Sequence, residues 1–334
     1  MKIENVSVWL KSLCLAMLFG LLSLGAAHAA EKRDFRSADT HLPDYPTVQA
    51  MQYMGKILSE RTQGRLSITV FHSRQLGEET DTIHMSQAGA VDLLRISMSP
   101  FTDLIPETRV LTLPFLFSSD EHYQAVLNGP IGQEVLAAFE PHGFVGLAYY
   151  ESGSRSFYTT KKPIKSLKDL KGLRIRVQNS DLIAATIEAL GATPVKMSFG
   201  QVLTALETNI IDGAENNWPS YESTGHYKAA AHYSLSRHLR VPEVVVMSKS
   251  VWDTLSPDDQ ILIRQAALDS QQVMAQLWKE RVDRARKTVE AANVQVYELE
   301  DIDAFQQAVK PVYDKFIRDP KLRDLVRRIR ATKP

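Results

Sequence analysis

The stretch Lys171-Gly-Leu-Arg-Ile-Arg-Val-Gln178 predicts a short strand that carries an arginine near its end. Two other stretches, Glu151-Ser-Gly-Ser-Arg-Ser-Phe-Tyr158 and Ile211-Asp-Gly-Ala-Glu-Asn-Asn-Trp218, also place one long polar side chain at the mouth of a predicted strand or turn. A guanidinium group is a flat fork of donors that fits a carboxylate in bidentate geometry, and it stays charged at any working pH. The set therefore suits one small organic carboxylate. Its three side chains are Arg155, Arg176 and Asn216.

Outward from these stretches, strand and helix signals alternate along the chain, which favours parallel sheets flanked by helices. Apolar and β-branched runs predict strands, and apolar stripes at helical spacing predict helices. The predicted strands are 35–38, 66–71, 91–96, 145–150, 173–177, 193–197, 233–239 and 244–247. The predicted helices are 47–61, 80–88, 121–139, 180–190 and 199–208.

A longer helix is predicted to begin at Ser256-Pro257-Asp258-Asp259, which combines a capping hydroxyl, a proline at the first helical position and acids in the first turn. No glycine or proline follows until Pro311. A helix from Pro257 to about Asn293 would be roughly 55 Å long at the usual rise per residue. The alternative is two shorter helices joined by a turn that the sequence does not mark.

The three opening stretches, in this order, resemble the solute receptors of TRAP transporters, the DctP-like family. The resemblance covers residues 35–317 and implies an α/β, two-lobed periplasmic solute-binding protein fold, with a ligand cleft between the lobes and a long helix crossing both. Lobe one is expected to hold residues 30–152 and 241–280, and lobe two residues 153–240 and 281–334. In that family the positions of Arg155, Arg176 and Asn216 touch the ligand. Glu215 is expected to partner an arginine rather than the ligand.

Lobe one is expected to supply the other wall of the cleft through three side chains. His41 follows the first predicted strand, where an α/β lobe faces its cleft, although a loop histidine can equally be a plain surface residue. Glu79 could accept hydrogen bonds from ligand hydroxyls, or it could be a solvated acid at a helix start. Arg95 interrupts an apolar strand, so it should face either the cleft or Glu79, since an unpaired charge is costly to bury.

These lobe-one residues narrow the expected ligand to an acid with one carboxylate and several hydroxyls. The stretches Ala38-Asp-Thr-His-Leu-Pro-Asp-Tyr-Pro46 and Glu215-Asn-Asn-Trp-Pro-Ser-Tyr221 are similar to the branch of the family that binds hexuronates such as glucuronate and galacturonate. Small C4-dicarboxylates, aldonates and 2-oxo acids remain open as alternatives. The resemblance implies delivery of the ligand to the membrane subunits of a TRAP permease.

The ends and the composition indicate an exported chain. Residues 1–29 have the basic leader, the apolar run and the Ala27-His-Ala29 cleavage site of a signal peptide, which predicts a periplasmic protein. The single cysteine, Cys14, lies in this leader, so the mature chain has no thiol chemistry. Lysine plus arginine equals aspartate plus glutamate, 39 against 39, and no basic excess points to nucleic acid. The mature protein is expected to be a monomer.

Enzyme motifs are not found in the sequence: it has no phosphate-cradling glycine loop, no His-Glu-x-x-His and no nucleophile elbow. We therefore expect a receptor rather than an enzyme, with no cofactor and no metal. Two alternatives stay open. Glu79 and Glu215 could form the acid/base pair of a periplasmic uronate-processing enzyme. The same receptor could also be a ligand-sensing module of a membrane kinase or chemoreceptor.

Overall fold

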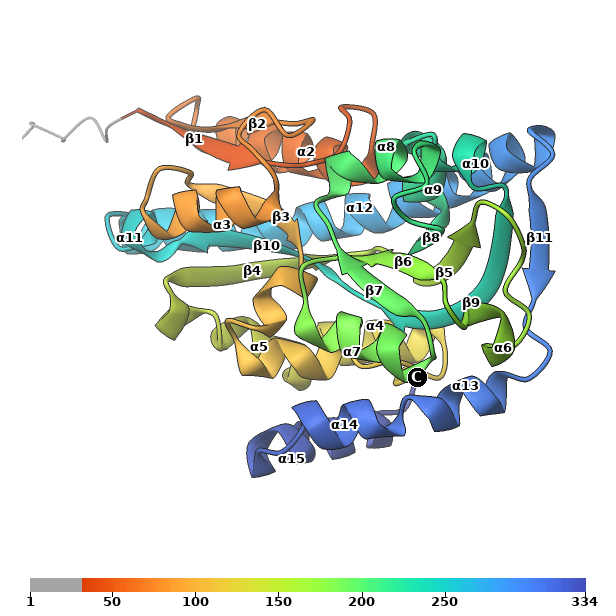
Figure 1. The fold of residues 1–334 in the computed structure, drawn as a ribbon. Helices are drawn as coiled ribbons and strands as arrows, with labels where there is room; N and C mark the ends of the chain where they lie inside the picture. The colour runs from red at the N-terminus through yellow and green to blue at the C-terminus, as the bar shows by residue number, and fades with distance from the viewer. Residues whose placement is uncertain (1–31) are drawn as a thin grey trace, which may run out of the picture.

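The computed structural model describes residues 32–334, and the predicted signal peptide 1–29 lies outside this part. Two mixed sheets with helices packed on their faces build the described chain (Figure 1). This arrangement confirms the predicted α/β class. All eight predicted strands are present, because alternating or β-branched runs pack well on a pleated, half-buried surface. Three further strands, at 154–159, 213–216 and 295–298, were not predicted.

The first sheet has the strand order β2-β1-β3-β10-β4. Its strands are β1 (Arg33–Ala38), β2 (Leu66–Phe71), β3 (Leu93–Ser97), β4 (Phe144–Tyr150) and β10 (Glu243–Ser248). The first three are parallel, whereas β10 runs antiparallel to both β3 and β4. The strand predicted at 244–247 therefore does return the chain to the first sheet.

The second sheet has the order β11-β9-β5-β8-β6-β7. Its strands are β5 (Ser154–Thr159), β6 (Arg174–Val177), β7 (Thr193–Lys196), β8 (Gly213–Asn216), β9 (His232–Arg240) and β11 (Gln295–Glu298). Strand β5 lies antiparallel to β8 and β9, while the pairs β6–β7, β6–β8 and β9–β11 are parallel. The prediction of parallel sheets holds for five strand pairs but not for the pairs made by β5 and β10. These two strands each enter a sheet from the other lobe, and they run in the reverse direction.

The helices cover both sheets and connect their strands. The α-helices are α2 (Pro46–Arg61), α3 (Glu79–Gln87), α4 (Asp120–Asn128), α5 (Pro130–Ala137), α6 (Leu167–Leu170), α7 (Asp181–Ala189), α8 (Val202–Glu207), α9 (Trp218–Ser223), α10 (His226–Ala229), α11 (Lys249–Trp252), α12 (Pro257–Ala291), α13 (Ile302–Ala308), α14 (Lys310–Phe316) and α15 (Pro320–Ala331). Short 3-10 turns are η2 (Ser99–Thr102), η3 (Pro106–Leu111), η4 (Glu140–His142) and η5 (Phe199–Gln201).

One predicted helix was wrong in extent. The helix expected at 121–139 is two helices, α4 and α5, with a break at Gly129-Pro130. Proline has no N–H to continue the α4 ladder, and it starts α5 at the first helical position instead.

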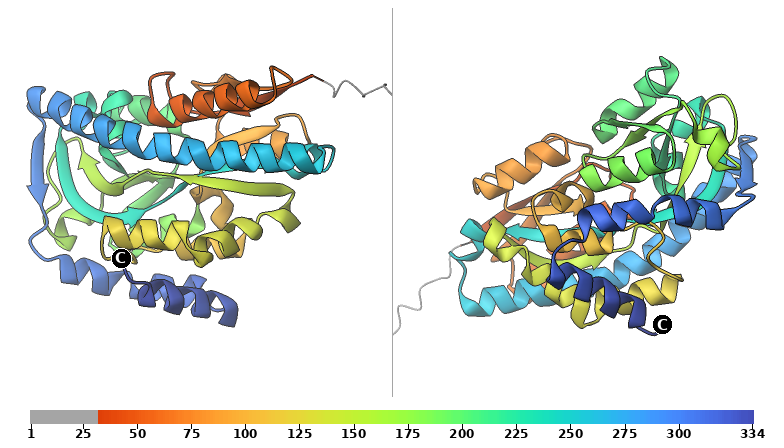
Figure 2. Two further views of the ribbon diagram at one scale, coloured as in Figure 1. Left: turned by 180° about the vertical axis from the view of Figure 1, so that it is seen from behind. Right: turned by 60° about the horizontal axis from the view of Figure 1, so that its bottom comes forward.

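The long helix α12 is continuous, so the alternative of two shorter helices is wrong. It packs on α2 and β4 beside the first sheet and on α9 beside the second. Figure 2, left panel, shows it running along the back of both halves of the molecule. Together with the crossings β4–β5 and β9–β10, it makes three connections between the lobes.

The last helix, α15, packs on elements from the first half of the chain. It packs against η3 and α5, and the ring Nε2 of His122 lies 2.8 Å from the carbonyl oxygen of Ile329. Arg328 pairs with Glu134 at 2.6 Å. Residues 320–331 are thus held by elements of the sequence range expected for lobe one, whereas α14 packs on α7 of the second half.

Candidate functional site

Arg155 lies on β5 and faces β8, which places its guanidinium beside Glu215 and Asn216. Its Nε donates to Glu215 Oε2 at 2.5 Å, and one terminal nitrogen donates to Glu215 Oε1 and to the Glu215 carbonyl oxygen, both at 2.8 Å. The other terminal nitrogen donates to Asn216 Oδ1 at 3.0 Å. Glu215 is therefore an arginine partner, as predicted. Since a guanidinium has five N–H groups, Arg155 keeps one N–H without a partner among residues 32–334.

Arg176, on β6, is buried but has a different environment. Its Nε and NH2 nitrogens both donate to the carbonyl oxygen of Met197, at 2.9 and 2.7 Å, and no ion pair within residues 32–334 includes it. Burial and the nearby positive charge of Arg155 lower its pKa. Because the Met197 bonds use one side of the fork, the end formed by NH1 and NH2 keeps N–H groups without a hydrogen-bond partner among residues 32–334, and we call it the open end of the fork. This open end is the geometry that a carboxylate fits.

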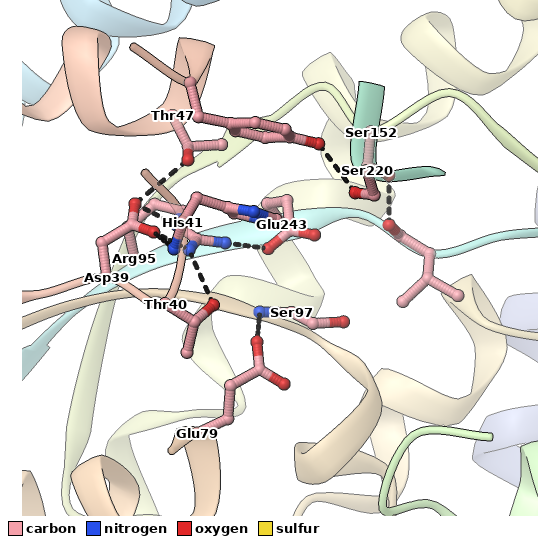
Figure 3. Close-up of polar contacts among 12 residues, drawn as sticks. Asp39, Thr40, His41, Thr47, Glu79, Arg95, Ser97, Ser152, Ser220 and Glu243 are labelled. Atoms are coloured by element: carbon pink, nitrogen blue, oxygen red, sulfur yellow. Dashed lines mark hydrogen bonds and ion pairs between the residues drawn. The ribbon is translucent and has the colours of Figure 1, made fainter. Parts of the chain in front are cut away.

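Arg95, on β3, is the centre of a buried ion network (Figure 3). Its Nε donates to Asp39 Oδ2 at 2.6 Å, its NH2 also pairs with Asp39, and its NH1 donates to Glu243 Oε2 at 2.6 Å. The expected alternatives for Arg95 were the cleft and Glu79. The structure gives it Asp39 and Glu243 as partners, and Glu79 acts on it only as a nearby charge. Two carboxylates hold this guanidinium because a buried charge requires compensation.

Glu79 is the first residue of α3 and is partly buried. Its Oε1 accepts the backbone N–H of Ser97 at 3.0 Å, and Figure 3 shows its carboxylate pointing toward β3. Burial, followed by the charge of Glu243, raises its pKa from 4.5 to about 7, against the opposing charges of Arg95 and Arg176. The neighbouring residue Thr80 meets lobe two, so Glu79 lies on the lobe-one wall between the halves.

His41 packs its ring face to face on Tyr45, with centroids 3.7 Å apart, and edge-on to Phe199 of the second half at 5.1 Å. Its backbone N–H donates to Asp39 Oδ1 at 2.7 Å, so the Arg95 network also fixes the His41 loop. Burial and the charges of Arg95 and Arg74 lower the pKa of His41, which keeps the ring neutral. A neutral imidazole can both donate and accept.

The two halves meet through direct hydrogen bonds, so the structure is in a closed arrangement. These bonds join Tyr45 to Ser220 (2.9 Å), Thr80 to Asn179 (3.1 Å), Ser99 to Gln178 (2.7 Å), Thr102 to Ser180 (2.7 Å) and Glu78 to the backbone of Gly200 (3.1 Å). A cavity of about 230 Å³ lies at this seam, with His41 and Arg74 on one side and Phe199 and His226 on the other.

A larger groove of about 550 Å³ lies elsewhere, along α12 and the interlobe crossings, and includes Gly153, Trp218 and Trp278. It does not contain Arg155, Arg176 or Glu79. Within residues 32–334, no group of three or more histidine, cysteine or acidic side chains could hold a metal ion. None of the helices in this range combines the length and apolar character that a membrane crossing needs.

Of the predicted site residues, the structure brings Arg155 and Asn216 into direct contact and places Arg176 near Arg155. On the opposite wall, His41 and Arg95 are joined through Asp39. Glu79 is near enough to Arg95 and Arg176 for both positive charges to act on its pKa. Sequence reasoning missed four residues that shape this site: Asp39, Tyr45, Ser220 and Glu243. The first two stand in the quoted stretch around His41. The sequence holds no signal that would pair Glu243 with Arg95.

Two α/β lobes, three interlobe connections and a buried cation in the seam define the class of two-lobed solute-binding receptors. Comparison with known proteins supports this assignment. Residues 38–319 match the family described as bacterial extracellular solute-binding protein, family 7. A solute-binding protein of Chromohalobacter salexigens is 37% identical over 312 residues, which cover 93% of each chain.

Solved structures of TRAP periplasmic solute-binding proteins are also similar. One from a Bradyrhizobium species, in complex with D-galacturonate, is 55% identical with a TM-score of 0.89, covering 90% of this chain and 100% of that one. One from Roseobacter denitrificans, with bound β-D-glucuronate, is 38% identical with a TM-score of 0.88 and the same coverage. This chain belongs to the DctP family of TRAP solute-binding proteins, whose members are receptors.

Proposed function

We propose that this receptor binds a hexuronate, glucuronate or galacturonate, in the closed cleft and delivers it to a TRAP permease. The observation that carries this proposal is the open end of the Arg176 fork. A buried cation without an acidic partner within residues 32–334 favours an anionic ligand, because binding supplies the missing compensation. The similar structures with bound galacturonate and glucuronate support the choice of sugar acid.

In the proposed complex, the ligand carboxylate lies on the open end of Arg176. The remaining N–H of Arg155, on β5, and the carboxamide of Asn216, on β8, assist. On the lobe-one side, Glu79 and the ring of His41 bind hydroxyl groups. Arg95 has one N–H without a partner within residues 32–334, so its part in ligand contact is limited to a single hydrogen bond. Its main role would be to hold Asp39 and Glu243.

Closure would follow from differential binding. The ligand would first meet Arg176 in lobe two, and the contacts from lobe one would form only when the halves close. A ligand can shift such an equilibrium only by binding the closed state better than the open one. The interlobe hydrogen bonds of the structure would then further stabilise the closed state.

Several further assignments belong to the same proposal. Residues 1–29 are taken as a signal peptide and the mature protein as a periplasmic monomer without enzyme activity. Of the lobe bounds expected from the sequence, lobe one would keep 30–152 and 241–280, and lobe two would keep 153–240 and 281–319. Because α15 packs on η3 and α5, we assign residues 320–331 to move with lobe one. A C4-dicarboxylate, an aldonate or a 2-oxo acid is the alternative ligand.

Isothermal titration of the mature protein with D-galacturonate and D-glucuronate tests this function. We expect Arg176→Ala to weaken binding by about 2 to 5 kcal/mol, since it removes a desolvated charge-assisted pair. Arg176→Lys should also weaken binding, because a point charge cannot reproduce the fork. Arg174→Ala is the matched control, since Arg174 lies on the same strand but pairs with Asp212 at a half-exposed position. An unchanged dissociation constant for Arg176→Ala would refute the assignment.

A further inference from the structure

Among residues 32–334, the side chains around the closed cleft leave one positive charge without an acidic partner, which is enough to bind one carboxylate but not two. Arg155 is neutralised by Glu215, and Arg95 is shared by two acids, Asp39 and Glu243. Only Arg176, among the cations of this site in residues 32–334, has no acidic partner. One bound carboxylate therefore balances the single open cation.

The cations at the edges of the site are also paired. Arg74, beside the His41 loop, lies 3.6 Å from Glu78, and Arg281, on α12, pairs with Glu222. The nearby histidines add no charge, because burial lowers the pKa of His226 to about 3 and also lowers that of His41. A ligand with two carboxylates would thus bring its second charge to a wall that has no free cation.

Glu79 makes that wall actively unfavourable to a second negative charge. The Ser97 N–H holds one of its oxygens at 3.0 Å, and the other makes no hydrogen bond within residues 32–334. The adjacent Thr80–Asn179 bond fixes this end of α3 against lobe two. The free oxygen can accept a hydrogen bond from a hydroxyl, but a carboxylate there would meet both Glu79 and Glu243 as like charges.

We propose that Glu79 is a specificity-determining residue that rejects ligands with a second carboxylate, so that the cleft selects sugar acids with a single negative charge. This inference rests on the proposed function, since it takes Arg176 as the anchor of the first carboxylate. On this proposal, electrostatic repulsion by Glu79, rather than the shape of the cleft, decides that the receptor binds a hexuronate and not a dicarboxylate.

A pair of open-chain acids tests the rejection without a change of shape. L-galactonate is D-galacturonate reduced at C1, and galactarate is the same chain oxidised at C1, so the two differ by one carboxylate. Their dissociation constants are measured by competition against D-galacturonate at pH 8. We expect the wild type to bind galactarate roughly 100-fold or more weakly than L-galactonate, because like charges in a poorly solvated site repel strongly.

Glu79→Gln should reduce this ratio on the order of tenfold or more, because it removes the repulsion while the amide keeps the size of the side chain and an oxygen that can accept the Ser97 N–H. Glu79→Asp should keep most of the ratio, and Glu60→Gln, an exposed acid on α2, should leave it unchanged. In the wild type the ratio should also fall from pH 8 to pH 5.5 as Glu79 takes up a proton, while galactarate stays doubly charged.

The outcomes separate this inference from the proposed function. If D-galacturonate itself does not bind the wild type, the proposed function fails. If D-galacturonate binds, but the ratio is near one or is the same in the wild type and in Glu79→Gln, only the role of Glu79 is overturned.

Discussion

At the scale of single residues, two buried arginines on strands that flank β8 have different partners and therefore different roles. Arg155 is held by Glu215 through both carboxylate oxygens, so most of its donors are already used. Arg176 binds only a backbone carbonyl and keeps its end open. Both were predicted as equal forks for the ligand. The structure leads us to propose Arg176 as the anchor and Arg155 as a support.

Glu79 gives a pH-dependent prediction at the same scale. Its pKa is raised from 4.5 to about 7 in the folded state. Between these values the folded protein keeps a proton on Glu79 that the unfolded chain has released, so this residue lowers stability as the pH rises, and the loss is complete above pH 7. Glu79→Gln removes the effect. Without ligand, the free energy of unfolding of the variant minus that of the wild type should rise by on the order of 1–3 kcal/mol as the pH increases from 4.5 to 8.

Urea unfolding of both proteins at several pH values measures this difference. Glu60→Gln serves as the control, since Glu60 is exposed and the difference in unfolding free energy between this variant and the wild type should not change with pH. A gap between Glu79→Gln and the wild type that stays constant with pH would contradict the raised pKa.

The sequence predicted the residue types of the site better than their partners. Arg155, Arg176 and Asn216 stand in stretches that resemble a known family, and so they could be singled out. The partners of Arg95 could not, because Asp39 is 56 residues away and Glu243 is 148 residues away along the chain. Such pairs form only when β1, β3 and β10 assemble into one sheet.

At the scale of elements, local signals located most strands and helices. The stretch from Ser256 to Asp259 predicted the start of α12, and the structure confirms the capping bond from Asp259 N–H to the Ser256 hydroxyl at 3.2 Å. The Gly129-Pro130 break was missed because apolar spacing continues on both sides of it. Strand direction was also missed, because it depends on which lobe the chain enters and not on local sequence.

The continuity of α12 gives a prediction at this scale. Gln276 is an exposed residue near the middle of the helix. Gln276→Pro should lower the free energy of unfolding by about 3 kcal/mol or more, because it removes a helical hydrogen bond and clashes with the preceding turn. Gln276→Ala should change it by less than about 0.5 kcal/mol. Chemical denaturation measures both, and a proline variant as stable as the wild type would indicate an interrupted helix.

At the scale of the whole molecule, the lobes are closed on each other through side-chain hydrogen bonds across the seam. Tyr45 is the clearest example: its ring packs on His41, and its hydroxyl lies 2.9 Å from Ser220 Oγ across the seam. The Arg95 network holds the loop that carries His41, since Asp39 binds both. Closure and the lobe-one wall are therefore built from one connected group of residues.

Tyr45→Phe removes the interlobe hydrogen bond and little else. A typical hydrogen bond contributes about 1 kcal/mol, so the dissociation constant for D-galacturonate should rise roughly fivefold, mainly through faster release. Tyr149→Phe is the matched control, because its hydroxyl donates to the Gly132 carbonyl within lobe one at 2.8 Å. It should leave affinity unchanged. Equal effects of the two variants on the release rate, measured by stopped-flow, would argue against a role of Tyr45 in closure.

The most direct test of the central claim is a crystal structure of the mature protein grown with D-galacturonate. We predict that the two oxygens of the ligand carboxylate lie about 2.7–2.9 Å from NH1 and NH2 of Arg176, between closed lobes. A sugar whose carboxylate lies away from Arg176, on the lobe-one wall or outside the seam, would contradict it.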